Sequence, residues 1–258
     1  PTDTNDTLIE GTDYSYYAGA LVVKTEKGIT VKNVDSEVAS ADAISIQKDV
    51  AANITLAGVN IEAENAAIVI AEDSSADVTI ILADNTKNSL VSGNNKAAIQ
   101  KTSSSGKLTV TCEHAKEFHD CDKTCGALMA KGNGYGAGIG GIADKITGDL
   151  VIAGGVISAY SEDGAGIGDG RQSFNNGSGI YITGGSITAS SNQGAGIGCG
   201  FAALNKKMKI VISGGKIIAT STQGAGIGGC ISNVETDVTI SGGSIRTTSI
   251  VGAQIGRA

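Results

Sequence analysis

The sequence predicts an all-β protein: a right-handed parallel β-helix, or solenoid, of about eight coils with an inserted Cys/His loop. Three observations lead to this prediction: a pentapeptide that recurs at near-constant spacing, short alternating strands around it, and a composition rich in small residues. We expect one domain over residues 1–258, with an N-terminal cap over 1–27, coils over 28–256 and the inserted loop at 112–135.

The repeat is clearest in the second half of the chain. The pentapeptide GAGIG occurs four times and is followed by a fifth copy, GAQIG, at residues 136–140, 164–168, 194–198, 224–228 and 252–256. A Gly-Gly pair lies ten residues before each of the last four copies. Runs such as Ile210-Val211-Ile212 alternate like short strands, and no stretch shows the 3.6-residue period of a helix. The pattern therefore predicts that each unit forms several strands joined by tight turns.

The first half contains the same unit without its glycines. First strands begin near residues 29, 54, 78, 108, 150, 180, 210 and 238, so the units are 24–30 residues long, apart from one of 42. A unit of this length suits one coil, which buries its apolar side only when neighbouring coils stack on it. Right-handed winding follows from the general preference of parallel crossovers. A β-propeller is the alternative, but its blades usually need about 40 or more residues.

Composition and charge exclude several other classes. The 258 residues include 38 glycines and one proline, and 41% are hydrophobic. Collagen needs much more proline, disordered chains have fewer apolar residues, and a membrane helix needs about 20 consecutive apolar residues. We therefore expect no membrane insertion. The net charge of −7 argues against nucleic acid as a partner.

Both halves of the chain resemble a known group. The GAGIG units, with ITLAGVNIEAENAAIVI at 54–70 and VTIILADNTKNSLVSGNNKAAI at 78–99, resemble glycine-rich surface and secreted proteins of anaerobic, mostly Gram-positive bacteria. Within these, the sequence is similar to the group called carbohydrate-binding domain-containing proteins. The resemblance covers about residues 28–256. It implies a right-handed parallel β-helix, and for some members the binding of acidic or cellulosic plant polysaccharides with calcium.

The 42-residue unit contains an insert rich in cysteine and histidine. Thiolates and imidazoles gathered within 14 residues are suitable ligands for zinc. The candidate metal ligands are Cys112, His114, His119, Cys121 and Cys125. The alternative is a protruding loop with free thiols or with one disulfide, from Cys112 to Cys121 or Cys125. Either way, a long insert on a regular rod indicates a functional loop.

The remaining two cysteines follow successive GAGIG copies. Cys199 and Cys230 would lie close together on neighbouring coils, either as a disulfide or as two small buried side chains. The GAGIG loops themselves are structural turns in this interpretation. They lack the helix that a phosphate-binding glycine loop requires.

Candidate ligand-binding residues lie in the variable loops after GAGIG. Sugar sites combine aromatic faces with a few well-placed polar groups. The candidates are Asp169, Arg171, Phe174 and Phe201. The acids Glu162, Asp163 and Asp169 could serve a hydrolase, but their positions do not recur from coil to coil, so we interpret them as solvated turn charges. No motif assigns a catalytic residue.

The functional prediction follows from these features. We expect a non-catalytic binding or adhesion module, secreted or on the cell surface, whose partner is a polysaccharide or host glycan. Alternatives are a structural stalk that presents other domains, and a β-helix polysaccharide lyase or glycosidase. Calcium and zinc are the candidate cofactors. The chain stops directly after GAQIG without an evident cap, so we also expect a fragment or an end that packs on a partner.

Overall fold

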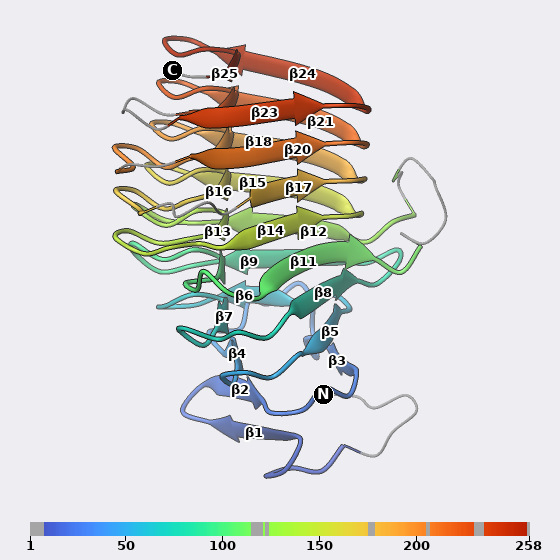
Figure 1. Ribbon diagram of the computed structural model, residues 1–258. Coiled ribbons are helices and arrows are strands. Elements are labelled where there is room, and N and C mark those ends of the chain that lie inside the picture. Colours follow the sequence, from blue (N-terminus) through green and yellow to red (C-terminus); the bar gives the residue numbers. More distant parts are fainter. Residues whose placement is uncertain are drawn as a thin grey trace.

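In the residues that the structure describes, the fold is a stack of coils built from β-strands joined by turns and loops. The computed structural model describes residues 8–114, 121, 124–174, 179–204, 207–229 and 235–256. Three long sheets run along the stack, and the described chain climbs from its N-terminal to its C-terminal end (Figure 1). In the described part of the chain, no helix is long and apolar enough to cross a membrane.

From β5 onward, each coil contributes one strand to each sheet. The eight-stranded sheet contains β3 (Ile29–Val31), β5 (Asn53–Leu56), β8 (Val78–Leu82), β11 (Lys107–Cys112), β14 (Asp149–Ile152), β17 (Gly179–Ile182), β20 (Met208–Ile212) and β23 (Thr236–Ile240). The seven-stranded sheet contains β6 (Asn60–Glu62), β9 (Lys87–Val91), β12 (Ala127–Lys131), β15 (Val156–Ser161), β18 (Ser186–Ser191), β21 (Lys216–Ser221) and β24 (Ser244–Ser249).

The third sheet has ten strands. It contains β1 (Tyr14–Tyr17), β2 (Ala20–Val23), β4 (Ala43–Ile46), β7 (Ile68–Ile70), β10 (Ile99–Gln100), β13 (Ile139–Gly140), β16 (Ile167–Gly168), β19 (Ile197–Gly198), β22 (Ile227–Gly228) and β25 (Ile255–Gly256). Within the described residues, β1 and β2 form the one antiparallel pair, and this hairpin joins the stack through β4.

The architecture confirms the right-handed parallel β-helix that the sequence predicts. The coil count differs slightly. Seven coils have a strand in all three sheets, whereas the first has β3 and β4 joined by a segment that touches the seven-stranded sheet through a Ser40–Ile61 bridge. The insert is also shorter than 112–135, because Ala127–Lys131 forms β12 in register with its neighbours.

The core consists of side chains stacked on their equivalents one coil away. Ile152, Ile182 and Ile212 are paired in register, and all three are buried. Parallel strands lie about 4.8 Å apart, so identical branched side chains pack directly on one another. Buried serines reinforce one corner: the Oγ of Ser191 donates a hydrogen bond to the carbonyl oxygen of Gly164 at 2.7 Å. Equivalent bonds join Ser161 to Gly136, Ser221 to Gly194 and Ser249 to Gly224.

The last glycine of each pentapeptide lies under the same glycine of the next coil. Gly198 has φ +144°, a conformation that side chains disfavour, and an added Cβ would overlap the carbonyl oxygen of Gly228. The same overlap would occur between Gly168 and Gly198. We call this series, Gly140, Gly168, Gly198, Gly228 and Gly256, the glycine column. Glycine is required here because backbone packs on backbone.

Gly198→Ala should therefore strongly destabilise the fold. Backbone strain of about 1–3 kcal/mol and overpacking of about 1–3 kcal/mol predict a loss of roughly 3 kcal/mol or more in the free energy of unfolding. Gly28→Ala is the control, since Gly28 has open space around it and no positive φ. Urea denaturation of both variants measures the difference. Equal stability of the two variants would contradict the claim that glycine is required in the glycine column.

A buried lysine occupies the position directly after β10. Lys101 is 2% exposed, and its Nζ donates hydrogen bonds to the carbonyl oxygens of Ser103 at 2.6 Å and Ser105 at 3.0 Å. Burial lowers the pKa of Lys101 to about 8. Asp169 and Cys199 occupy the equivalent position in later coils, since each donates its backbone N–H to the last glycine of the neighbouring unit. The residue in this position is buried after each of β10, β13, β16, β19 and β22.

The lysine gives stability a defined pH dependence. Between about pH 8 and pH 10.5 the unfolded chain retains the Lys101 proton while the folded chain loses it, so the free energy of unfolding should rise with pH. Below about pH 8 both states are protonated and this contribution is flat. Lys101→Met removes the titrating group, and urea titrations of both chains across this range isolate its effect. Parallel stability curves for the two chains would count against the lowered pKa.

Candidate functional site

The loops that follow β13, β16 and β19 stack on one corner of the coil. Arg171 donates its backbone N–H to the carbonyl oxygen of Tyr135 at 2.9 Å, and Phe201 does the same to Asp163 at 2.7 Å. Tyr135 and Asp163 each precede a GAGIG copy, whereas Arg171 and Phe201 occupy equivalent positions after one. Residues far apart in the sequence thus meet at this corner.

An arginine lies between two aromatic rings from the coils on either side. The Arg171 Cζ is 4.4 Å from the ring centroid of Tyr135 and 5.7 Å from that of Phe201. Both distances fall within the range of cation–π attraction. Both rings hold the guanidinium at this corner, while 26% of the Arg171 side chain stays exposed.

A carboxylate completes the arrangement. The Oδ2 of Asp163 is 3.8 Å from the Nη1 of Arg171, and its Oδ1 accepts a hydrogen bond from the Nε2 of Gln193 at 2.6 Å. Burial raises the pKa of Asp163, and the negative charge of Glu162 adds to this while Arg171 opposes it. At 3.8 Å the arginine and the carboxylate form an ion pair but no hydrogen bond.

The other two predicted ligand residues differ in position. Phe174 is 48% exposed and forms a β-bridge with Leu204 on the next coil, so it extends the same corner with an apolar surface. Asp169 is 1% exposed, because it occupies the inward position described for Lys101. Asp169 is therefore not part of the surface. We define the Arg171 patch as Tyr135, Asp163, Arg171, Phe174 and Phe201.

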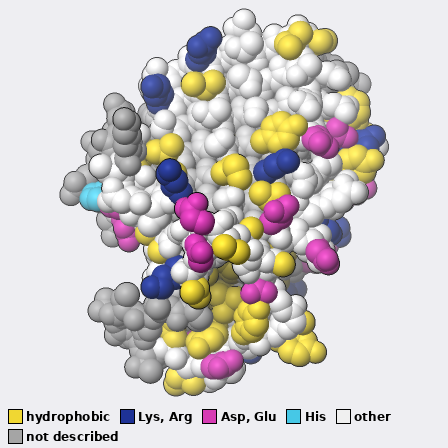
Figure 2. All heavy atoms as spheres, turned by 180° about the vertical axis from the view of Figure 1, so that it is seen from behind, with side chains coloured by type: hydrophobic (Ala, Val, Ile, Leu, Met, Phe, Trp, Pro, Cys, Tyr) yellow, Lys and Arg dark blue, Asp and Glu magenta, His cyan; other side chains and the backbone are white. Residues whose placement is uncertain are grey.

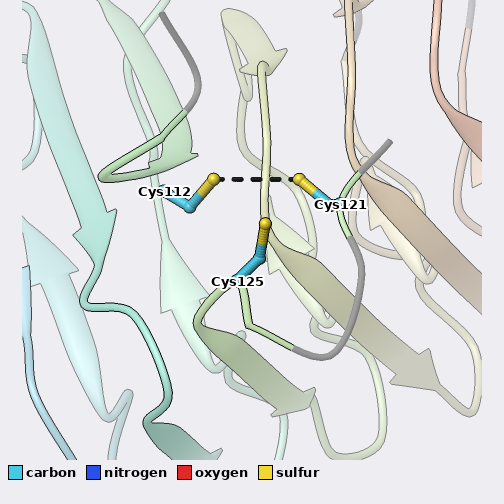
Figure 3. A group of neighbouring side chains, drawn as sticks. All are labelled: Cys112, Cys121 and Cys125. Atoms are coloured by element: carbon cyan, nitrogen blue, oxygen red, sulfur yellow. Dashed lines mark hydrogen bonds between the residues drawn. The ribbon is translucent and has the colours of Figure 1, made fainter. Parts of the chain in front are cut away.

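A second site lies where the insert joins the coil. Cys112 ends β11, and the sulfurs of Cys112, Cys121 and Cys125 all lie within 4.8 Å of one another. Figure 3 shows the three side chains pointing toward a common centre. The Sγ atoms of Cys112 and Cys121 are 3.7 Å apart, and the Gly155 N–H donates to the Sγ of Cys121 at 3.0 Å. All three are buried, and none forms a disulfide.

The environment of Cys121 favours its neutral thiol. Burial is the main reason why the pKa of Cys121 is raised, and the neighbouring Cys125 and Cys112 add to it, while the Gly155 N–H opposes it. The thiolate is the reactive form of cysteine, so a raised pKa makes the thiol a poor nucleophile.

Of the two histidines of the insert, only His114 is described, and it is not part of this cluster. His114 is half exposed and pairs through its Nδ1 with the Oδ2 of Asp84. His119 lies outside the described residues. Of the other two cysteines, Cys199 is disulfide-bonded, whereas Cys230 also lies outside the described residues. Among the described residues, no group of carboxylates converges as calcium would require.

The structure also contains a cavity that the sequence did not indicate. It has a volume of about 530 Å³ and lies at the first coil, where no strand extends the seven-stranded sheet beyond β6. Aliphatic side chains dominate its lining, including Leu21, Val31, Val38, Ile44 and Ile61, and among the lining residues only Tyr16 is aromatic. Apolar side chains gather at this lower end of the molecule (Figure 2). The segment between β3 and β4, residues 32–42, is as long as the one between β5 and β7, residues 57–67, but it forms no strand where the next coil has β6.

Comparison with known families supports the architecture. The model of a β-helix repeat family, described as "Beta helix repeat", matches residues 150–171, 180–201 and 210–229. These segments run from β14, β17 and β20 through the GAGIG copies, so three successive coils match separately. No curated protein and no solved structure matches the chain. Fold and repeat together define a parallel β-helix protein.

The stacking of Arg171 should contribute measurably to stability. We expect Arg171→Gln to lower the free energy of unfolding by about 1 kcal/mol, because it removes cation–π contacts with two rings. Lys209→Gln is the matched control. Lys209 lies over a single ring, that of Tyr181, at 6.0 Å on another face, so its removal should cost less. Urea denaturation measures both, and a larger loss for Lys209→Gln would contradict the interpretation.

Proposed function

We propose that this protein is a non-catalytic binding module that holds a polysaccharide or glycan against the Arg171 patch. The observation that carries the proposal is the guanidinium held between Tyr135 and Phe201. Aromatic faces stack on the apolar faces of sugar rings, and a fixed guanidinium donates paired hydrogen bonds to hydroxyl or carboxylate oxygens. The patch combines both kinds of group on one corner.

The hydrogen-bonding state of Arg171 supports this use. Its contact with Asp163 is longer than a hydrogen bond, so this carboxylate does not occupy the N–H groups of the guanidinium. The guanidinium is therefore oriented by stacking and charge, while its outer N–H groups remain for a ligand. Phe174 extends the patch with an exposed ring. A carboxylate-bearing sugar would gain most from such an arginine.

The disulfide of Cys199 supports a location outside the cytosol. Disulfides persist in secreted and surface proteins and are rare where thiols are kept reduced. The proposed module would therefore be secreted or displayed at the cell surface, where polysaccharides and host glycans are accessible. A parallel β-helix suits this role, because a rigid stack presents loops from neighbouring coils at fixed spacing.

A glycan array tests the proposal directly. The labelled chain should bind acidic or neutral glycans in the native form, and Arg171→Gln should weaken that binding about tenfold or more, as expected for a lost charged hydrogen bond. Phe174→Ala should also weaken it. Lys209→Gln, which removes a cation from a different face, should bind like the native chain. Arrays with and without chelator show whether calcium contributes.

Three other outcomes would point elsewhere. Absence of binding to every glycan would favour a structural stalk. Depolymerisation of a bound polysaccharide, detected as new reducing ends or unsaturated products, would favour a lyase or glycosidase. Binding that survives Arg171→Gln and Phe174→Ala unchanged would place the site away from the Arg171 patch.

A further inference from the structure

The three-cysteine cluster matches the geometry of a metal–thiolate site. In a tetrahedral zinc site with Zn–S bonds of about 2.3 Å, neighbouring sulfurs lie about 3.8 Å apart. The Cys112–Cys121 separation is 3.7 Å, and Cys125 lies within 4.8 Å of both. A disulfide would need about 2.05 Å between two sulfurs. The observed spacing therefore leaves room for an ion at the centre.

The cluster replaces core packing at one corner of the stack. Cys112 is paired in register with Leu82 of the preceding coil, so a sulfur occupies a position where that coil has a large aliphatic side chain. The other two sulfurs, those of Cys121 and Cys125, come from the insert, and both residues also lie in the core. Three thiols from two segments converge where a tight turn would otherwise suffice.

A backbone donor is already aimed at the cluster. Gly155, at the Gly-Gly turn before β15, donates its N–H to the Sγ of Cys121 at 3.0 Å. Hydrogen bonds from outside the ligand set orient the ligands and offset their negative charge. Gly155 has φ +94°, and a side chain there would meet Leu82, so the turn brings the bare backbone to the sulfur.

The oxidation states of the cysteines differ within one chain. Cys199 is disulfide-bonded, whereas the cluster keeps three thiols within 4.8 Å of one another. Where one disulfide forms, other closely spaced thiols of the same chain are also subject to oxidation, and a bound metal is one means of holding them reduced. This argument does not depend on glycan binding.

We propose that Cys112, Cys121 and Cys125 bind one zinc ion as thiolates and so fasten the insert to the coil. On binding, each S–H gives its proton to solvent as an S–Zn bond forms. Three thiolates and Zn²⁺ leave a net charge of −1, which the Gly155 N–H partly offsets. The described residues supply three of the four donors that tetrahedral zinc takes. The ion is structural, because it joins the end of β11 to the residues directly before β12.

Cobalt substitution of the native chain is the decisive experiment. The reduced chain is titrated with Co²⁺, a spectroscopic probe for tetrahedral zinc sites. We expect one equivalent to bind, with a thiolate-to-cobalt charge-transfer band, and one equivalent of Zn²⁺ to displace it. Zinc should also raise the melting temperature, and a chelator should lower it again, because the ion binds only the folded insert.

Two variants assign the ligands. Cys125→Ser should remove the charge-transfer band, because a hydroxyl is a poor ligand for a soft ion. His114→Ala should keep the band, since His114 pairs with Asp84 rather than with the cluster. Circular dichroism of both variants shows whether the stack remains folded.

Three results would overturn the proposal: a reduced native chain that gives no charge-transfer band, a band that survives Cys125→Ser, or a disulfide among these cysteines that forms equally fast with zinc present. Glycan binding is measured separately on the same samples. A module that binds glycans but not cobalt refutes the zinc site alone, and a module that binds cobalt but no glycan refutes only the proposed function.

Discussion

The close approach of one backbone to the next along the ten-stranded sheet is the constraint on which this structure depends. At the glycine column, neighbouring coils are so close that the space of a single Cβ is already occupied. That contact keeps the short strands β13 to β25 in register. Because register is maintained, isoleucine stacks on isoleucine in the core, and the serine hydroxyls each find a carbonyl oxygen one coil away. The serine hydrogen bonds and the stacked isoleucine core therefore both depend on the close backbone contact at the glycine column.

The two candidate sites lie where this regularity is interrupted. The Arg171 patch combines side chains from three successive coils, and none of those coils holds the site alone. The cysteine cluster lies at the one corner, within the described coils, where a long insert replaces a tight turn. In both cases the scaffold supplies fixed positions, and departures from the repeat supply the chemistry.

The fold could be predicted from the sequence because each coil repeats the same pattern of glycines and branched residues. The two candidate sites were harder to predict from the sequence. Arg171 and Phe201 share a position in their units, so their proximity could be predicted, whereas Tyr135 and Asp163 precede the pentapeptide and required counting across coils. Asp169 was misleading, since polar character suggests exposure but its position faces inward. The short spacing in the sequence likewise grouped His114 with the cysteines as a metal ligand. In the structure its side chain pairs instead with Asp84 on the preceding coil.

The modular stacking also bears on how such a chain lengthens. From β5 to β25 each strand pairs only with strands of the immediately neighbouring coils, so an in-frame duplication of 30 residues between two pentapeptides would add one rung and leave the other strand pairs unchanged. The buried serine and glycine contacts would be copied with it, while the exposed loop of the new rung would be free to diverge. The genetic unit of growth and the physical unit of folding are therefore the same segment.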